Sequence, residues 1–401
     1  MKYLLFNDDK QIDFYPLTLT RPVFYLRCGH FTIIEKWKNY LQDSVYQYVS
    51  GFLKEKFHTA AMLDEAVCWI NGRFFPNEIL FQEIQTLPKE KRLITPEGET
   101  IAWKGISPEK NWVEVKNAVD NFPTQIFFGE TTRLNHITDI FRLNKTALIN
   151  DYQWLTKNKP SQQTINDPYT KIYSPENIWL GENVIIRAAT LNASLGPIIL
   201  DDNVEIQEGA IIAGAHSVGK NAVINMGAKL RGDSTIGPYC KVGGEIANSV
   251  FLAYSNKAHD GFIGNSLIGE WCNLGADTNN SNLKNNYETI KQYSYRTKRL
   301  ESTGLQFCGL TVGDHSKSGI NTMFNTGTVV GVSANIFGGG FPPTFIPSFS
   351  WGGSETLAQY RFEKAIEAAN KMMQRRNQML SVSDINILKT IFEAEQKTAL
   401  S

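Results

Sequence analysis

The most regular pattern of hydrophobic positions in this chain has a period of six residues and runs from residue 200 to residue 242. Every sixth residue there is aliphatic: Leu200, Ile206, Ile212, Val218, Ile224, Leu230, Ile236 and Val242. A period of six is neither the 3.6 of a helix nor the two of a single strand, and it is a repeat length of parallel β-helices. Eight consecutive matches argue against a β-sandwich with coincidental spacing. We therefore predict a β-helix whose aliphatic side chains point inward and stack from coil to coil.

The residues around each aliphatic position agree with that fold. Mostly small residues, suited to a tight corner, stand two positions before each later aliphatic one: Val204, Ala210, His216, Ala222, Ala228, Ser234 and Cys240. Glycines at 209, 219, 227 and 237 are expected to relieve the turns, where a Cβ would restrict φ.

Interruptions of the six-residue pattern indicate where function lies. The pattern starts irregularly at Ile178, is expected to break for a loop over 249–260, and resumes at Phe262, Ile268 and Leu274. It breaks again over 278–304, and the last coils carry Val312, Phe324, Val330 and Ile336, with Ser318 as the polar exception. A regular coil has little reason to break unless a loop reaches something, so functional residues are expected in the interruptions.

The segments on either side of the β-helix have helix and strand patterns of their own. Apolar runs at 3–6, 66–70 and 124–128 predict strands, and 33–41 predicts a helix, which together indicate a small α/β domain. Two amphipathic helices are expected over 354–379 and 384–399, packed on the coil or on a neighbouring subunit. The predicted organisation is an α/β domain over 1–155, a polar, proline-containing linker over 156–175, the β-helix over 176–348 and helices over 354–401.

Composition excludes several classes of partner. Forty basic residues balance forty acidic ones, which gives no bulk charge for a nucleic-acid or membrane surface. The N-terminal apolar run is too short for a signal peptide, and no stretch approaches the ~18 apolar residues of a membrane span. The five cysteines form no C-x-x-C pair, and Cys240 and Cys272 fall in the small-residue slots. We expect a soluble, reduced, cytoplasmic protein.

The start of the chain resembles sugar-1-phosphate nucleotidyltransferases. The resemblance rests on an N-terminal strand, a loop and then Pro16-Leu17-Thr18-Leu19-Thr20-Arg21-Pro22, similar to P-L-T-x-x-x-P in that family. The family's glycine-rich phosphate loop is absent, because the loop here reads Asn7-Asp8-Asp9-Lys10, and Val23 replaces the family's lysine. Asn71-Gly72-Arg73 stands where the family has N-G-D, and arginine cannot ligate Mg²⁺.

This resemblance implies a shortened, divergent nucleotidyltransferase domain, with Mg²⁺ needed only if that domain is active. Arg21 and Arg27 are candidates to bind an anionic sugar nucleotide through their guanidinium groups. Salt bridges at the surface or between domains are the equally weighted alternative for both arginines.

The stretch from Asn256 to Asn285 resembles the acetyltransferase half of bifunctional N-acetylglucosamine-1-phosphate uridylyltransferase/glucosamine-1-phosphate acetyltransferases. That family shows K-x-x-H-x-x-Y-x-G-D, then N-x-G-A-G-T and N-Y-D-G, and the likeness extends over roughly residues 178–340. It implies a left-handed parallel β-helix of hexapeptide repeats that assembles as a homotrimer with active sites between subunits. The implied residues are His259 as general base, Asn282 and Glu245 beside it, Lys257 and Asn273 on the substrate, and Gly275, Ala276 and Gly319 along acetyl-CoA.

Three departures from the acetyltransferase pattern bear on the acceptor. Phe262 replaces a tyrosine that helps to bind sugar phosphate, Leu283 replaces the tyrosine of N-Y-D-G, and Glu288 stands near an expected lysine. Each change removes a partner for a phosphate or a hydroxyl, so the acceptor need not be glucosamine-1-phosphate.

The residue chemistry independently favours His259 among the six histidines. Attack of an amine on a thioester needs a base that titrates near neutrality, which is a property of histidine. His259 lies in a predicted interruption with Lys257 and Asp260 nearby, whereas His216 fills a small-residue slot and is expected to be structural. His315 could line the same site, and a solvated loop residue is the alternative for His259.

Three functions follow for testing. The first is a CoA-dependent acyl(acetyl)transferase acting on an amino-sugar phosphate or sugar nucleotide. The second is a sugar-1-phosphate nucleotidyltransferase whose β-helix serves assembly, against which the missing glycine-rich loop counts. The third is a non-catalytic sugar-nucleotide-binding protein, against which the presence of His259 and Asn282 counts. The sequence does not identify the acceptor sugar or the acyl donor.

Overall fold

The computed structural model describes residues 2–42, 44–59, 67–105 and 112–399. The chain forms two compact units, and each unit consists of three separate stretches of the sequence. Unit 1 comprises Met1–Phe14, Thr20–Leu26 and Phe31–His136, and unit 2 comprises Tyr15–Leu19, Arg27–His30 and Ile137–Ser401.

Unit 1 is an α/β domain around one six-stranded sheet of order β2-β1-β3-β5-β4-β6. Strands β1, β2 and β3 are parallel, and β5 runs antiparallel to both β3 and β4. The strands are β1 Tyr3–Phe6, β2 Val45–Tyr48, β3 Cys68–Asn71, β4 Arg92–Ile94, β5 Thr100–Lys104 and β6 Thr124–Ile126. The helices are α1 Ile33–Leu41, α2 Lys54–Phe57, α3 Glu78–Thr86 and α4 Trp112–Asp120.

The predicted elements of unit 1 agree with the structure. The strand over 3–6 and the helix over 33–41 have the predicted bounds, and the strands expected at 66–70 and 124–128 are β3 and β6. Residue 66, the first residue of the strand predicted over 66–70, lies outside the described residues. Helix α1 begins with a capping box, in which Thr32 and Glu35 each bind the other's backbone N–H.

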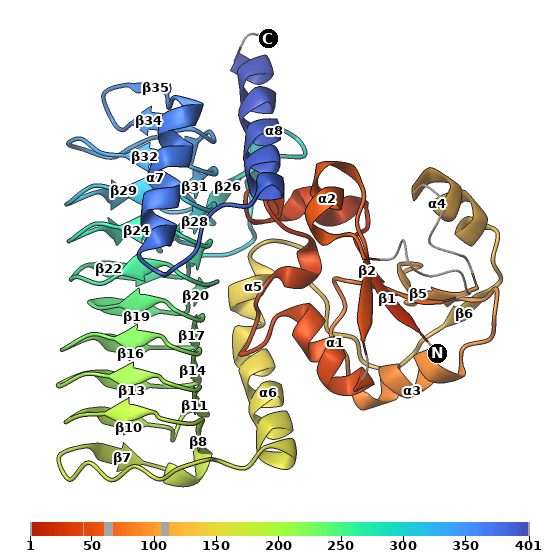
Figure 1. Cartoon of the computed structure of the whole chain (residues 1–401), viewed down its shortest axis with the longest axis horizontal. Coiled ribbons are helices and arrows are strands. Elements are labelled where there is room, and N and C mark those ends of the chain that lie inside the picture. Colours follow the sequence, from red (N-terminus) through yellow and green to blue (C-terminus); the bar gives the residue numbers. More distant parts are fainter. Residues whose placement is uncertain (1, 43, 60–66, 106–111, 400–401) are drawn as a thin grey trace. The chain divides into compact units, whose positions relative to one another are not determined.

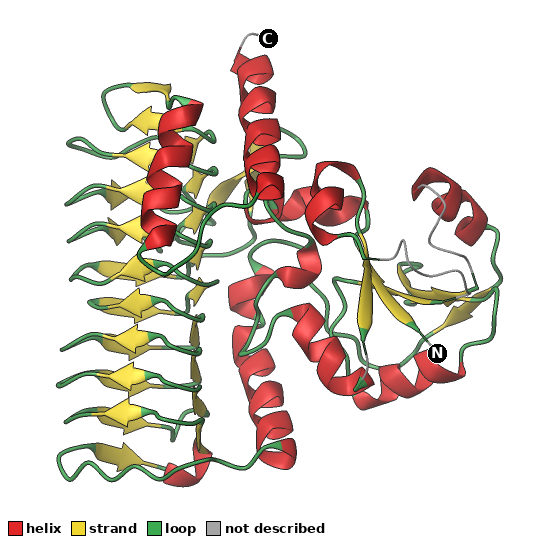
Figure 2. Cartoon of the chain, in the orientation of Figure 1, coloured by secondary structure: helices red, strands yellow, loops and turns green. Residues whose placement is uncertain are grey.

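Unit 2 contains a parallel β-helix, whose stacked coils are shown in Figures 1 and 2. Its three faces are called here the β7–β22, β8–β33 and β9–β35 sheets. The first has β7 Lys171–Tyr173, β10 Thr190–Asn192, β13 Ile211–Ala213, β16 Lys229–Arg231, β19 Glu245–Ala247 and β22 Phe262–Gly264. The second has β8 Ile178–Leu180, β11 Ile198–Leu200, β14 His216–Val218, β17 Ser234–Ile236, β20 Val250–Phe251, β23 Leu267–Ile268, β28 Thr311–Val312, β31 Val329–Val330 and β33 Phe345–Ile346. The third has β9 Ile185–Ile186, β12 Glu205–Ile206, β15 Val223–Ile224, β18 Lys241–Val242, β21 Asn256–Lys257, β24 Asn273–Leu274, β29 Lys317–Ser318, β32 Asn335–Ile336, β34 Ser350–Gly352 and β35 Leu357–Gln359.

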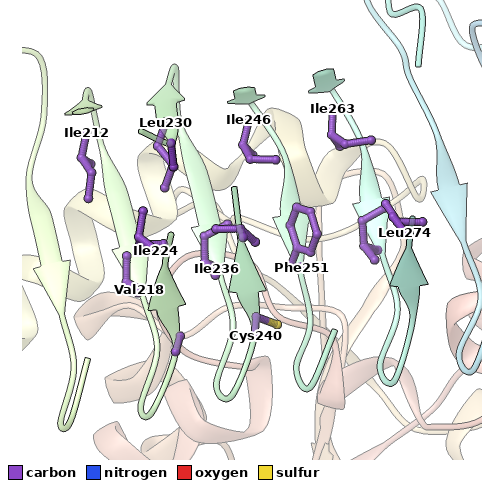
Figure 3. Close-up of a cluster of buried hydrophobic side chains, with 14 of the residues drawn as sticks. Ile212, Val218, Ile224, Leu230, Ile236, Cys240, Ile246, Phe251, Ile263 and Leu274 are labelled. Carbon is purple, nitrogen blue, oxygen red and sulfur yellow. The ribbon is translucent and has the colours of Figure 1, made fainter. Parts of the chain in front are cut away.

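The predicted six-residue pattern is confirmed as the core of this β-helix. All eight aliphatic residues from Leu200 to Val242 are at most 1% exposed. Equivalent residues lie in register on successive coils, as Ile206, Ile224 and Val242 do in the β9–β35 sheet. Figure 3 shows five of these side chains pointing into one continuous interior, namely Ile212, Val218, Ile224, Leu230 and Ile236. The predicted hexapeptide β-helix preceded by an α/β domain and followed by helices is therefore the observed fold.

The turn glycines have two different causes, not the single one predicted. Gly209 and Gly227 have left-handed φ values of 73° and 68°. At Gly219 and Gly237 the constraint is close approach, since a Cβ on Gly237 would lie 1.7 Å from the Leu252 carbonyl oxygen. Side chains are excluded at these two positions because the next coil packs directly against the backbone.

The first predicted interruption, over 249–260, is wrong. This segment contains β20 and β21, which continue their sheets without a break. The phase also differs from the prediction, because Ile263 points inward while Phe262 lies on the outer side, half-buried. The reason is that Ile263 and Ile268 are five residues apart in the chain rather than six, so counting back six from Ile268 reaches Phe262 instead.

The second interruption is present and contains a hairpin. Strands β26 Lys291–Ser294 and β27 Arg299–Ser302 pair antiparallel within it. A short parallel pair, β25 Asn279–Asn280 and β30 Met323–Phe324, flanks it.

Helices complete unit 2. They are α5 Asp139–Arg142, α6 Asn144–Asn158, α7 Phe362–Gln374 and α8 Val382–Ala399. Helix α6 contacts β8 and β17 of the coil, and the predicted linker contains its last turn and strand β7. Helix α7 begins eight residues later than expected from Ser354, because β35 first pairs antiparallel with β34. None of the helices in the described part of the chain is both long and apolar enough to cross a bilayer.

Candidate active site

His259 lies at the corner where the chain passes from β21 to β22, which we call the His259 corner (residues 258–261). The backbone of this corner is held from the coils on both sides. The carbonyl of Ala258 accepts a hydrogen bond from Asn225 Nδ2 (2.8 Å), that of Asp260 from the Asp277 N–H (2.9 Å), and that of Gly261 from the Glu245 N–H (3.0 Å). The imidazole is exposed and has no hydrogen-bond partner among the described residues. The His259 ring is therefore accessible from solvent, while the backbone that carries it is held in place.

The preceding coil turns more sharply below the His259 corner. Val242 and Ile246 are four residues apart, whereas Ile224 and Leu230, and Lys257 and Ile263, are six apart. The short turn consists of Gly243 and Gly244, and a Cβ on Gly244 would lie 2.5 Å from the Gly261 carbonyl oxygen. Only glycine allows the two corners to stack this closely.

Lys257 is placed inside the coil, not at the surface. It is 0% exposed and pairs in register with Val242, an inward-pointing rung. Its Nζ donates to the carbonyls of His259 (2.5 Å) and Asp260. Burial lowers the pKa of Lys257 to about 8. The predicted substrate-contacting lysine therefore contacts the inner side of the His259 corner.

Glu245 and Phe262 neighbour each other on the outer side of the β7–β22 sheet. Their Cα atoms pair in register on β19 and β22. Arg231 Nε donates to Glu245 Oε1 at 2.6 Å, and the Arg231 guanidinium carbon lies 5.9 Å from the Phe262 ring centroid. Because the arginine side chain is 62% exposed, this pair contributes little stability and remains accessible to a ligand.

Side-chain amides replace the backbone ladder beyond β22. Asn280 Oδ1 accepts from the Gly264 N–H (2.9 Å) while its Nδ2 donates to the Gly264 carbonyl (3.0 Å), and Asn279 Oδ1 accepts from the Phe262 N–H (2.7 Å). The Asn280 side chain thus stands in for a peptide group. Asn282 is two residues further along the chain, and its Nδ2 donates to Asn265 Oδ1 at 2.8 Å.

The remaining residues predicted in the β-helix lie on the coils that follow the His259 corner. Asn273 is on β24, in register with Asn256 and Lys317. Gly275 and Ala276 form the next corner and Gly319 the one after, and a Cβ on Gly275 would lie 2.8 Å from Gly319 backbone atoms. The structure therefore orders the predicted residues along one edge of the coil: Glu245, the His259 corner, Gly275–Ala276 and Gly319.

Arg21 and Arg27 are buried, with 5% and 9% exposure. Arg21 belongs to unit 1 and Arg27 to unit 2, where its Nη1 donates to the His30 carbonyl. Their burial places both guanidinium groups inside the protein rather than on its surface.

Arg73 is the residue that the resemblance aligns with the metal-binding aspartate of sugar-1-phosphate nucleotidyltransferases. The side chain is fully buried between two carboxylates, with Nη2 2.7 Å from Asp8 Oδ2 and in contact with Glu99 Oε1. Its Nη1 donates to the Leu134 carbonyl at 2.7 Å. A guanidinium donates no lone pair, so these residues do not fit a divalent cation. The described residues contain no group of three or more histidine, cysteine, aspartate or glutamate side chains placed to hold a metal ion.

The other two histidines considered from sequence are buried. His216 is 0% exposed, and burial lowers its pKa to about 4, which keeps the ring neutral. His315 is 8% exposed at a coil corner with a left-handed φ of 61°. All five cysteines are buried thiols outside any disulfide.

Sequence reasoning missed Asn225, Arg231, Asn279 and Asn280 at this site. Asn225 and Arg231 both lie two coils before the His259 corner, and only the register of the coils brings them near it. The two asparagines fall in the interruption predicted over 278–304, where the polar run after Thr278 was the sequence signal and no role was assigned to either residue.

Comparison with known proteins confirms the resemblance predicted from the motifs. Residues 3–160 match the family model described as sugar nucleotidyl transferase. The chain is 26% identical over 243 residues to the bifunctional protein GlmU of Synechococcus elongatus, covering 57% of this chain and 48% of that protein. It is 31% identical over 146 residues to a bifunctional sugar-1-phosphate nucleotidylyltransferase/acetyltransferase of Sulfurisphaera tokodaii, covering 36% of each. The chain thus spans about half the length of the Synechococcus elongatus protein.

Among solved structures, a UDP-N-acetylglucosamine acyltransferase is 16% identical and covers 59% of this chain and 83% of its own, with a TM-score of 0.30. The polySia-specific acetyltransferase NeuO is also 16% identical, covering 53% of this chain and 95% of its own with a TM-score of 0.23.

Proposed function

We propose that the protein is a CoA-dependent acyltransferase that acylates the amine of an amino-sugar phosphate or nucleotide sugar, with His259 as general base. One observation carries the proposal: an exposed imidazole without a partner stands on a corner whose backbone is held from both neighbouring coils. A base that must meet a substrate amine needs this combination of a free ring and a fixed position.

The reaction follows from the ring's chemistry. His259 accepts a proton from the amine as the nitrogen attacks the thioester carbonyl of acetyl-CoA or another acyl-CoA. A C–N bond forms, the C–S bond breaks, and the proton leaves with the CoA thiol. Asn282 and Glu245 are proposed to orient the acceptor, with Asn273 contacting the sugar. Gly275, Ala276 and Gly319 offer backbone without bulky side chains along which the acyl-CoA can lie.

The acceptor is tested first, because the site departs from a glucosamine-1-phosphate site at Phe262, Leu283 and Glu288. Glu288 places a carboxylate where a phosphate partner was expected, and its Oε2 lies 3.6 Å from Lys284 Nζ. Incubating the protein with acetyl-CoA and a panel of amino-sugar phosphates and nucleotide sugars, followed by mass spectrometry and thiol detection, identifies the acceptor. Absence of acylated product from the whole panel would count against the proposal.

We expect a homotrimer in solution. The edge of the coil that carries the His259 corner exposes Met226 (71%) and Ile320 (72%) at the equivalent corners of other coils. Apolar side chains repeated along one edge favour cover by another copy of the chain, which would also complete the site beside His259. Light scattering at micromolar concentration measures the mass, and a monomer would argue against a site shared between subunits.

The second candidate function is sugar-1-phosphate nucleotidyl transfer by unit 1, favoured by the family match over residues 3–160. The third is sugar-nucleotide binding without catalysis. Because Arg73 lies between Asp8 and Glu99, we expect no nucleotidyl transfer. An NTP and a sugar-1-phosphate incubated with the full chain and Mg²⁺ should release no pyrophosphate. Release above a blank that is lost in a charge-reversal variant of Asp8 would show unit 1 to be active.

A further inference from the structure

Lys257 is a charged residue in a line of inward-pointing residues that is apolar on both sides of it, with the small polar Ser318 only after Leu274. In the β9–β35 sheet the rungs before it are Ile206, Ile224 and Val242, and the next is Leu274. Lysine almost never lies fully buried without a partner, because its charge loses hydration there. An aliphatic side chain would fill this rung at lower cost, so packing does not account for the lysine.

The contacts of the Lys257 ammonium account for it better. Its two hydrogen-bond partners among the described residues are the carbonyls of His259 and Asp260, which belong to the His259 corner. A Cβ on Gly261 would lie 3.1 Å from Nζ, so the ammonium lies directly beneath the corner backbone. Bonds from an ionised donor are about twice as strong as neutral ones. Lys257 therefore binds from the inside the same backbone that Glu245 and Asp277 bind from the neighbouring coils and Asn225 binds from two coils away.

We propose that Lys257 is a positioning residue, whose buried ammonium fixes the backbone of the His259 corner and through it the His259 ring. Its effect on turnover rests on the proposed function, whereas its effect on the corner does not. The assignment differs from the substrate contact that the resemblance implies, because an interior ammonium cannot meet a sugar at the outer surface.

The variant Lys257→Met removes the ammonium and keeps a long apolar side chain in the rung. Leu274→Met is the matched control, because it places methionine in the next rung of the same sheet and nearly conserves volume. Hydrogen exchange of the full chain, followed by mass spectrometry of the peptides that contain residues 258–262, reports on the corner without any substrate. We expect exchange there to be at least about tenfold faster in Lys257→Met, with the peptides of β14 and β17 unchanged. Leu274→Met should match the wild type.

Unchanged exchange in Lys257→Met overturns the proposal, as does equal acceleration in Leu274→Met, since that would reflect loosening of the coil in general. With an acceptor in hand, kcat should fall about 10–10²-fold with little change in KM, because misplacement by about 1 Å has this effect. A wild-type kcat in Lys257→Met, beside an inactive His259→Ala, also overturns it. If His259→Ala remains active, the proposed function fails while the exchange result still decides the role of Lys257.

Discussion

Replacing His259 by alanine should lower acyl-transfer turnover by about 10²–10⁴-fold with little change in acceptor binding, because general-base catalysis acts on the transition state. The same reasoning predicts that the wild-type rate falls in acid, since an imidazolium cannot accept the proton of the amine. Asn282→Ala should lose less, because its amide is one of several orienting contacts and already binds Asn265. With the acceptor found by mass spectrometry, initial rates of CoA thiol release measure the losses in His259→Ala and Asn282→Ala. The same rates, taken across pH for the wild type, measure the fall in acid.

His216→Ala is the control for this experiment. His216 is fully buried in the coil, so its replacement leaves a cavity and should lower the free energy of unfolding without a specific loss of rate. A His259→Ala variant that turns over the acceptor at the wild-type rate would remove His259 from catalysis and leave only a solvated surface residue at that corner.

The regular coils could be predicted from sequence because each one repeats the same requirement. A six-residue strand and corner can bury one side chain inward, and Leu200 to Val242 satisfy that need with aliphatic residues in every coil. The strand and helix bounds at Tyr3–Phe6 and Ile33–Leu41 were equally accessible, since local patterns and a capping box determine them.

The prediction failed where long-range contacts changed the local rule. Lys257 occupies an aliphatic rung, and the spacing of inward residues is shortened twice between Val242 and Phe251, so residues 249–260 fell out of the six-residue phase and were predicted as a loop. The expected interruption around His259 is an ordinary corner made unusual by what lies inside it. A buried ammonium that binds two carbonyls has no signature in the sequence beyond a lysine six residues after the inward-pointing Phe251.

The candidate site was recoverable in part for the same reason. His259, Asn282 and Glu245 were named from a motif, and the structure places them along consecutive coils. Asn280, which stands in for a peptide group against Gly264, could not be found, because that role depends on a gap in the ladder that only the three-dimensional register creates.

Arg73→Met should destabilise unit 1 by about 3–5 kcal/mol at pH 7, the largest stability effect we expect in this protein. Removing one partner from a buried ion pair leaves its carboxylates uncompensated, and here both Asp8 and Glu99 lose the same guanidinium. Arg92→Met is the matched control. Arg92 pairs at 2.9 Å with an Asp120 that is 57% exposed, and such a pair contributes less than about 1 kcal/mol.

The dependence of this loss on pH tests its cause. Burial raises the pKa of Glu99, but the hydrogen bond from Lys10 and the charge of Arg73 outweigh it and leave the pKa below its usual value. A lowered carboxyl pKa stabilises the folded state above the unfolded pKa of about 4.3, and this contribution disappears as pH falls through the folded value. The difference in unfolding free energy between wild type and Arg73→Met should therefore be greatest near pH 7 and shrink below about pH 4. Urea titrations at both pH values measure it. A difference that stays constant with pH would mean that lost packing around the Arg73 side chain, rather than lost charge pairing, causes the destabilisation.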